Sequence, residues 1–129
     1  MITDIARDAI IARGLVPDDD IMIAGNRTPD WDGRPLILIT TDPTRPENLT
    51  QFGAINSATT LSIHCITLTS QEAWDIVRKA ARAVYGEFEK MENRPKSGIL
   101  CITLVDHVVF QVPDRSEFQA SVSFNVLHQ

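Results

Sequence analysis

Three histidines and two cysteines are the side chains in this sequence with the most chemistry to offer: His64, His107, His128, Cys65 and Cys101. No pair of them has the CxxC, HxxxH or HExxH spacing that recurs in zinc sites. His64 and Cys65 are adjacent in a segment that is typical of a β-strand, where neighbouring side chains point to opposite faces. We therefore predict no metal site at these residues.

Nucleophilic catalysis and phosphate binding have equally little support. The sequence has no GxSxG motif, Cys65 and Cys101 lie in apolar runs without an evident general base, and the six glycines form no GxGxxG or GxxxxGK loop. The run Asp18–Asp20 lacks the Gly and Glu that a calcium loop of the EF-hand type requires. Asp30 and Asp32 fall in a turn-like stretch with Pro and Gly. A triad assembled only in three dimensions stays open, but the sequence predicts a protein that is not an enzyme and needs no cofactor.

Length and charge set the class of protein. With 129 residues, the chain fits one domain, residues 1–129, with a single core. A net charge of -5 and a pI near 5.0 argue against a protein whose main task is to bind nucleic acid. No apolar run approaches the roughly 20 residues of a membrane span, and the N-terminus has no basic region or cleavage site of a signal peptide. We expect synthesis in a cytoplasm and no membrane partner.

Apolar periodicity predicts two helices. In the first, Ile5, Ala9 and Ala12 recur at helical spacing, Ile10 and Ile11 widen the apolar stripe, and Gly14 supplies the end. The second opens at Thr69, which has the three-residue offset from Glu72 of a capping box. Its broad apolar face consists of Ala73, Ile76, Val77, Ala80, Ala81, Val84 and Phe88.

Five segments have strand character, which gives an α+β fold with the order αβββαββ. The last strand alternates apolar Phe118, Ala120, Val122, Phe124 and Val126 with polar residues, and a short polar connection joins it to the preceding strand as an antiparallel hairpin. The five predicted strands are residues 21–24, 36–40, 55–68, 99–112 and 118–126.

The segment "NRTPDWDGRPLILITTDPTRPENL" contains four prolines around one convincing strand and otherwise predicts long loops. Trp31 in this segment either makes a contact with a partner or folds back over the core. Loops of this length in a small domain are often functional. We expect the 26–35 and 41–53 loops to carry contacts, either to neighbouring subunits or to another protein of the same assembly.

Polar but weakly charged residues line the strands at two places. Ser121, Ser123 and Asn125 share one face of the last strand, and Ser57, Thr59 and Ser62 lie in the middle one. Such a surface can pack against another subunit or face water, and the sequence favours neither.

Four phrases of the sequence resemble a known family. They are "IARDAIIARGLV", "RTPDWDGRPLILITTDP", "SQEAWDIVRKAARAVYGEF" and "VVFQVPDRSEFQASVSFNVLH". Their order over nearly the whole chain is similar to that of bacteriophage minor capsid proteins that act as tail terminators, also called tail completion proteins. In members of that family a Gly-rich turn usually follows the strand at 36–40, whereas this chain has Thr41–Pro46.

The resemblance implies a mainly antiparallel sheet with two helices packed on one side. It also implies a ring, usually a homohexamer, at the head-proximal end of the tail tube in the virion. The ring would stop tube polymerisation and provide the surface for head-tail joining. Its partners would be copies of itself, the tail tube protein and a head-tail connector protein, and DNA would pass through without specific binding. Assembly would take place in the bacterial host cytoplasm.

Neither the residues nor the resemblance provides a catalytic group. Two other hypotheses stay open: another small phage neck protein, or a small ligand-binding module with a pocket lined by His64, His107 and Asp106. The residues we predict at an interface are Trp31, Arg34, Arg45, Ser121, Ser123 and Asn125.

Overall fold

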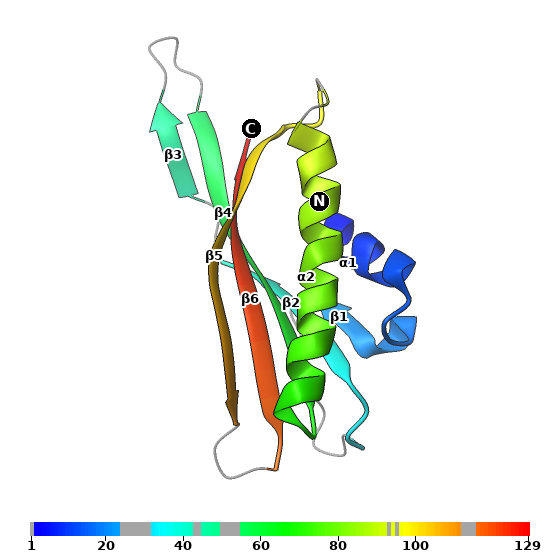
Figure 1. The fold of residues 1–129 in the computed structure, drawn as a ribbon. Helices are drawn as coiled ribbons and strands as arrows, with labels where there is room; N and C mark the ends of the chain where they lie inside the picture. Colours follow the sequence, from blue (N-terminus) through cyan, green and yellow to red (C-terminus); the bar gives the residue numbers. More distant parts are fainter. Residues whose placement is uncertain are drawn as a thin grey trace.

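The computed structural model describes residues 2–23, 32–42, 45–49, 55–92, 94, 96–111 and 116–129, with the side chains of 45–49 and 55–56 left outside the description. The elements follow one another along the chain as Figure 1 shows. They are α1 (Ile2–Arg13), a 3-10 turn η1 (Asp18–Asp20), β1 (Ile21–Ile23), β2 (Leu36–Thr41), β3 (Arg45–Leu49), β4 (Ile55–Thr67), α2 (Ser70–Glu92), β5 (Ile99–Gln111) and β6 (Phe118–His128).

The strands form one mixed sheet in the order β1-β2-β4-β6-β5, and β3 pairs with β4 beyond the end of β2. Only β1 and β2 are parallel, and the predicted hairpin of β5 and β6 is antiparallel. β4 is thirteen residues long, which lets it pair with β2 and β3 on one side and with β6 on the other. β1 and β5 are therefore the two opposite edges of the main sheet.

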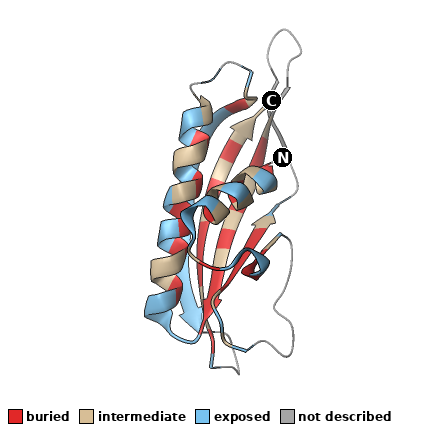
Figure 2. Cartoon of the chain, turned by 90° about the vertical axis from the view of Figure 1, so that its right-hand side faces the viewer, coloured by how far each residue is buried: buried red, intermediate tan, exposed pale blue. Residues whose placement is uncertain are grey.

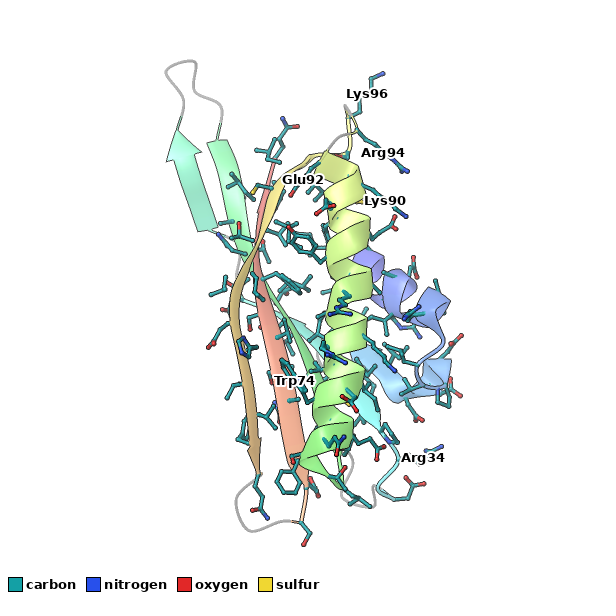
Figure 3. All side chains as sticks on the ribbon, in the orientation of Figure 1. Arg34, Trp74, Lys90, Glu92, Arg94 and Lys96 are labelled. Carbon is teal, nitrogen blue, oxygen red and sulfur yellow. The ribbon has the colours of Figure 1, made fainter. Side chains whose placement is uncertain are left out.

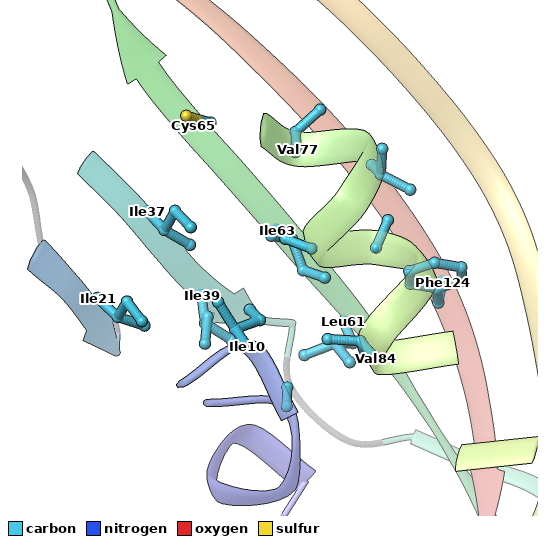
Figure 4. Packing of buried hydrophobic residues seen from close by; sticks show 14 of the residues in the cluster. Ile10, Ile21, Ile37, Ile39, Leu61, Ile63, Cys65, Val77, Val84 and Phe124 are labelled. Atoms are coloured by element: carbon cyan, nitrogen blue, oxygen red, sulfur yellow. The ribbon is translucent and has the colours of Figure 1, made fainter. Parts of the chain in front are cut away.

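Both helices cover the same face of the sheet (Figure 2), which confirms the predicted α+β fold with its helices on one side. The core lies between the helices and that face, and Figure 4 shows its centre. Every second residue of β4 and β6 points into it, because strand side chains alternate between faces. Its fully buried large side chains include Ile10, Ile37, Ile39, Leu61, Ile63, Val77, Val84, Phe88 and Val126.

Helix α2 has the cap and the apolar face that the sequence predicts. The backbone N–H of Glu72 donates to Thr69 Oγ1 at 3.2 Å, which is the Thr half of the capping box. Ala73, Val77 and Phe88 are among the buried residues of its inner face. In the described part of the chain, neither helix is both long and apolar enough to cross a membrane.

Helix α1 turns the predicted side to the core, but the centre of its buried stripe is shifted. Ile10 is fully buried as predicted, and Ile11 packs at the border of the core. The buried residues of the helix are Ile2, Ala6 and Ile10, while Ala12 is exposed. Ile5 and Ala9 pack only at the border of the core. The small and apolar residues of α1 form a broad stripe, and packing against α2 and the sheet sets which of them are fully buried. The end of the helix is as predicted, since Gly14 follows Arg13 with a φ of 70°.

The predicted order αβββαββ lacks one strand. Residues 45–49, which we assigned to a loop because of the surrounding prolines, form β3 and pair with β4. The pairing includes Pro46, and an irregularity in register lies between Pro46 and Asn48. Proline is tolerated there because β3 is an edge strand.

Two register shifts interrupt β5. One lies between Ile99 and Cys101 and the other between Leu104 and Asp106, so Leu100 and Val105 are the extra residues on the strand. Each shift inserts one residue opposite a regular partner strand, as a β-bulge does. The alternation of β5 side chains between faces therefore changes phase twice along its length.

Candidate assembly surface

The face of the sheet that carries no helix has an apolar part and a polar part. Leu36, Leu38 and Ile66 form a small buried cluster there, with Met22 packed against it. Hydroxyl and amide groups of β4 and β6 lie on the same face. In the register of β4 and β6, Ser62 is opposite Ser123 and His64 is opposite Ser121. These residues alternate with the core residues of the same strands, so they share the open face. The structure thus brings the predicted interface residues Ser121 and Ser123 together with side chains of the middle strand.

A hydrogen-bond network joins these polar groups across three strands. His64 Nδ1 lies 2.7 Å from Ser121 Oγ, and its Nε2 lies 3.0 Å from Thr40 Oγ1 on β2. Gln119 Nε2 is 3.2 Å from the same Nδ1, and the hydroxyls of Ser62 and Ser123 are 2.9 Å apart. The network fixes the rotamers of the open face and leaves it nearly uncharged.

The pair of Ser121 and His64 has the distance of a nucleophile and its base, but its surroundings do not complete a triad. The second ring nitrogen of His64 contacts the hydroxyl of Thr40 rather than a carboxylate. Burial lowers the pKa of His64 below its ordinary value, which favours the neutral ring. Ser121 itself is buried. We interpret this network as a structural one that holds the sheet face.

Asn125, the third predicted residue of this face, carries a buried oxygen, Oδ1, that has no hydrogen-bond partner. In the middle strand, the prediction of one polar surface was wrong for Thr59. That residue is buried, and its hydroxyl lies 2.9 Å from His128 Nε2. Ser57 and Thr59 differ from Ser62 by an odd number of positions, so the alternation of the strand places them on the other face.

Arg34, which Figure 3 labels, takes no part in this network and lies beside Asp20, directly before β1. Its Nε is 2.9 Å from Asp32 Oδ2, and its Nη2 is 3.6 Å from Asp20 Oδ1. The backbone N–H of Arg34 donates to Asp32 and holds the pKa of that carboxyl below its usual value. Arg34 thus organises an acidic corner of its own chain while its side chain remains largely exposed.

Two other predicted interface residues cannot be placed as side chains. Trp31 lies outside the described residues, as does most of the 26–35 loop. Arg45 belongs to β3, opposite Ala58, but its side chain is outside the description.

Strand β5 presents a second surface, which was not predicted from the sequence. Six of the nine large apolar side chains that are exposed in the described part of the chain belong to it, with exposed fractions of 39% to 59%. Proteins usually protect an edge strand with charged residues or proline, and the described strand has one charged residue, Asp106. These six side chains, which we call the β5 apolar row, are Leu100, Leu104, Val105, Val108, Val109 and Phe110.

A groove of about 540 Å³ runs between α2 and β5 beside this row. Trp74 projects from α2 towards the sheet (Figure 3), and its ring centroid is 5.5 Å from that of His107. Tyr85 and Phe124 make a similar contact at 6.0 Å. The exposed side chains of Arg78 and Arg82 also line the groove, which is therefore apolar with a basic margin.

The three residues of the ligand-pocket hypothesis do not converge. His64 is bonded within the open face, whereas His107 packs on Trp74 on the helix side of the sheet. Asp106 is opposite Ser123, and its Oδ1 accepts a hydrogen bond from the backbone N–H of His107. The described residues contain no cluster of three His, Cys, Asp or Glu side chains that could hold a metal ion.

One signal in the sequence could have identified the β5 surface. The segment "ILCITLVDHVVFQ" is apolar without strict alternation, which usually indicates a strand buried on both faces. Only the topology shows that this strand lies at an edge, where both of its faces are exposed.

Among the comparisons with known proteins, only that with solved structures bears on the fold. No family model matches the sequence, and no curated protein matches it. Among solved structures, the chain is similar to a chain of the "Virion of native gene transfer agent (GTA) particle", with a TM-score of 0.58 and 13% sequence identity. The similarity covers 95% of this chain and 92% of that one, so the two share their fold over nearly their full length.

Proposed function

We propose that this chain is a structural protein of a phage-like virion. It forms a ring of six copies at the head-proximal end of the tail tube, where it stops tube polymerisation and provides the surface for head-tail joining. The observation that carries the proposal is the fold shared, end to end, with a chain of a gene transfer agent virion. The resemblance of the sequence phrases to tail terminators supplies the specific role.

The two surfaces of the molecule support a role in assembly. The β5 apolar row and the groove beside it expose apolar area of the kind that marks a protein contact. The bonded side chains of β4 and β6 on the open face include no carboxylate, lysine or arginine, so they can meet another protein with little loss of solvated charge. In this role the chain is not an enzyme, and its net charge of -5 suits a conduit through which DNA passes without binding.

The test is whether the protein ends tube growth. The purified chain is added in increasing amounts to the tail tube subunit of its own virus during polymerisation, and tube lengths are measured by negative-stain microscopy. We expect shorter tubes with extra density at one end. Unchanged tube lengths and bare ends at saturating protein would reject the terminator role.

A small ligand-binding module is the second candidate, and the groove between α2 and β5 is the observation that favours it. Its volume and its aromatic residues, Trp74 and Tyr85, are suited to an apolar ligand. A ligand there would quench or shift the fluorescence of Trp74. Tube capping that survives replacement of Trp74 by a smaller apolar residue would favour the structural role.

A further inference from the structure

The two edge strands, β1 and β5, lie directly across the sheet from each other. Register pairs link Met22 of β1 to Leu38, His64, Ser121 and then Val108 of β5 in one row across the sheet. The edges face away from each other. Identical copies placed side by side would therefore bring the β5 edge of one copy towards the β1 edge of the next, which is a head-to-tail contact of the kind that closes rings.

The two edges differ in the balance of their charges. Near β1, four carboxylates outnumber the two cations Arg7 and Arg34, and Arg34 already contacts Asp20 and Asp32. On β5 itself, Asp106 is the one charged residue of the described strand. On the β1 side, Asp18 and Asp19 are exposed in the turn that leads into the strand. On the β5 side, Arg78 and Arg82 line the groove, and Lys79 lies beside them, all exposed. No hydrogen bond or ion pair joins these three cations to another described residue. Charges of opposite sign on two surfaces of one chain favour their mutual contact.

The apolar parts of the two edges also match. Ile23, at the end of β1, is 38% exposed, and the groove on the β5 side is apolar. The contact would use side chains rather than an added strand. Glu92 Oε1 accepts the backbone N–H of Ile102 at 2.7 Å, and Asp106 Oδ1 accepts that of His107 at 2.7 Å, so two N–H groups of β5 are already bonded.

We propose that a second copy of this chain docks its β1 edge on the groove between α2 and β5. Ile23 enters the groove, and Asp18 and Asp19 face Arg78 and Arg82. The proposal rests on the proposed ring and names the contact between its subunits. The contact joins two different surfaces, the β1 edge of one copy and the groove of another. A chain of copies therefore always has one free β1 edge and one free groove at its ends, until these two meet and the ring closes.

Cross-linking of a mixture of light and isotopically heavy chains tests this contact directly. A carbodiimide joins a lysine amine to a nearby carboxylate without a spacer, so Lys79 reports on Asp18 and Asp19. We expect heavy–light peptide pairs that join Lys79 to these aspartates, increasing with protein concentration. Absence of such pairs at high concentration, or pairs that join β5 to β5, would overturn the proposal.

Charge reversal provides the matched test. The variants R78E/R82E and D18K/D19K should each weaken self-association at least about tenfold, or about 1.4 kcal/mol, and mixing the two variants should restore a contact between them. The control K90E/R94E makes the same charge change at the far end of α2, where Figure 3 labels both residues, and should have no effect. Equal weakening by the control, or no recovery in the mixture, would contradict the assigned contact.

The outcomes separate this inference from the proposed function. If the wild-type chain shortens tubes but Lys79 gives no heavy–light pairs, the terminator role stands and the subunits join elsewhere. If the pairs form but tubes grow unchanged, the contact stands and the terminator role fails.

Discussion

At the scale of single residues, adjacent side chains on one strand have opposite environments. Cys65 points into the core, and His64 lies in the network of the open face. Burial, with a further contribution from the charge of Glu72, raises the pKa of the Cys65 thiol to about 12. The thiol is therefore protonated at any physiological pH, and it serves as a small apolar group.

The two cysteines should differ in reactivity. Cys101 is exposed on β5, whereas Cys65 is buried. We expect one thiol of the native protein to react with a chromogenic disulfide reagent near neutral pH, and both to react in denaturant. The variant C101S should show no fast reaction. Fast labelling of both thiols in the native wild type would contradict the buried, protonated state of Cys65.

His64 should make stability depend on pH. Its pKa in the folded protein lies below the ordinary value of 6.5, so the unfolded chain binds the proton more readily. The free energy of unfolding should therefore decrease as the pH falls from the ordinary pKa of histidine towards the lowered pKa of folded His64. Above the ordinary pKa, the contribution of His64 to stability should be fully present.

The measurement is urea unfolding at several pH values between about 7.5 and about 5. The variant H64Q keeps a polar side chain but removes the titration, so its stability should vary less over this window than that of the wild type. The difference between the two slopes isolates His64 from His107 and His128. Identical slopes would show that burial does not lower the pKa of His64.

At the scale of elements, helix α2 depends on its first turn. Thr69 accepts the backbone N–H of Glu72, and the hydroxyl of Thr67 donates to the carbonyl oxygen of Thr69 at 2.6 Å. Replacing Thr69 by Ala should lower the free energy of unfolding by about 1 kcal/mol, because one N–H at the helix start loses its partner. Chemical denaturation followed by circular dichroism measures the change, and T69S, which keeps the hydroxyl, should stay close to the wild type.

The β5 apolar row should govern self-association more than stability. The double variant V108K/F110K places two charges on exposed positions of the edge, and should lower the mass of the assemblies seen by native mass spectrometry at a given concentration. L68K changes an apolar residue of similar exposure outside this strand and serves as the control. Equal assembly in V108K/F110K and the wild type would exclude the row from the interface.

Local patterns in the sequence were enough to predict most helices and strands. They were not enough to predict the order of the strands in the sheet. Strict alternation in β6 and the broad apolar face of α2 identify both elements and the sides that they bury. The stripe of α1 was predicted with Ala12 in it, which is exposed, and without Ile2 and Ala6, which are buried. The position of β5 at an edge, and so its exposed apolar row, depends on strand order, which no local pattern contains. For the same reason, the groove beside Trp74 could not be foreseen.

At the scale of the whole molecule, charge is divided between two sides. Arg13, Arg78, Lys79 and Arg82 lie together on the surface of the helices, while the run Asp18–Asp20 lies towards the β1 edge. A chain with a net charge of -5 thus still presents one cationic surface. The division gives the molecule the directionality that a ring of identical subunits requires.

Salt should therefore weaken assembly without unfolding the chain. Raising the ionic strength from about 0.01 M to about 1 M shortens the screening length from about 30 Å to about 3 Å. We expect sedimentation velocity to show a lower fraction of assembled protein at high salt, with little change in the urea midpoint. Assembly that strengthens with salt would indicate an interface governed by apolar contacts alone.

The two bulges of β5 bear on how the sequence can vary over evolution. Leu100 and Val105 are extra residues, each without a partner of its own in the ladder with β6. Loss of either residue would restore a regular ladder and leave the register downstream intact, whereas loss of one residue within β4 or β6 would turn half of a strand inside out. Single-residue insertions and deletions should therefore accumulate in β5 among distant relatives, which lets the outer edge of the sheet adapt to new partners while the core stays the same.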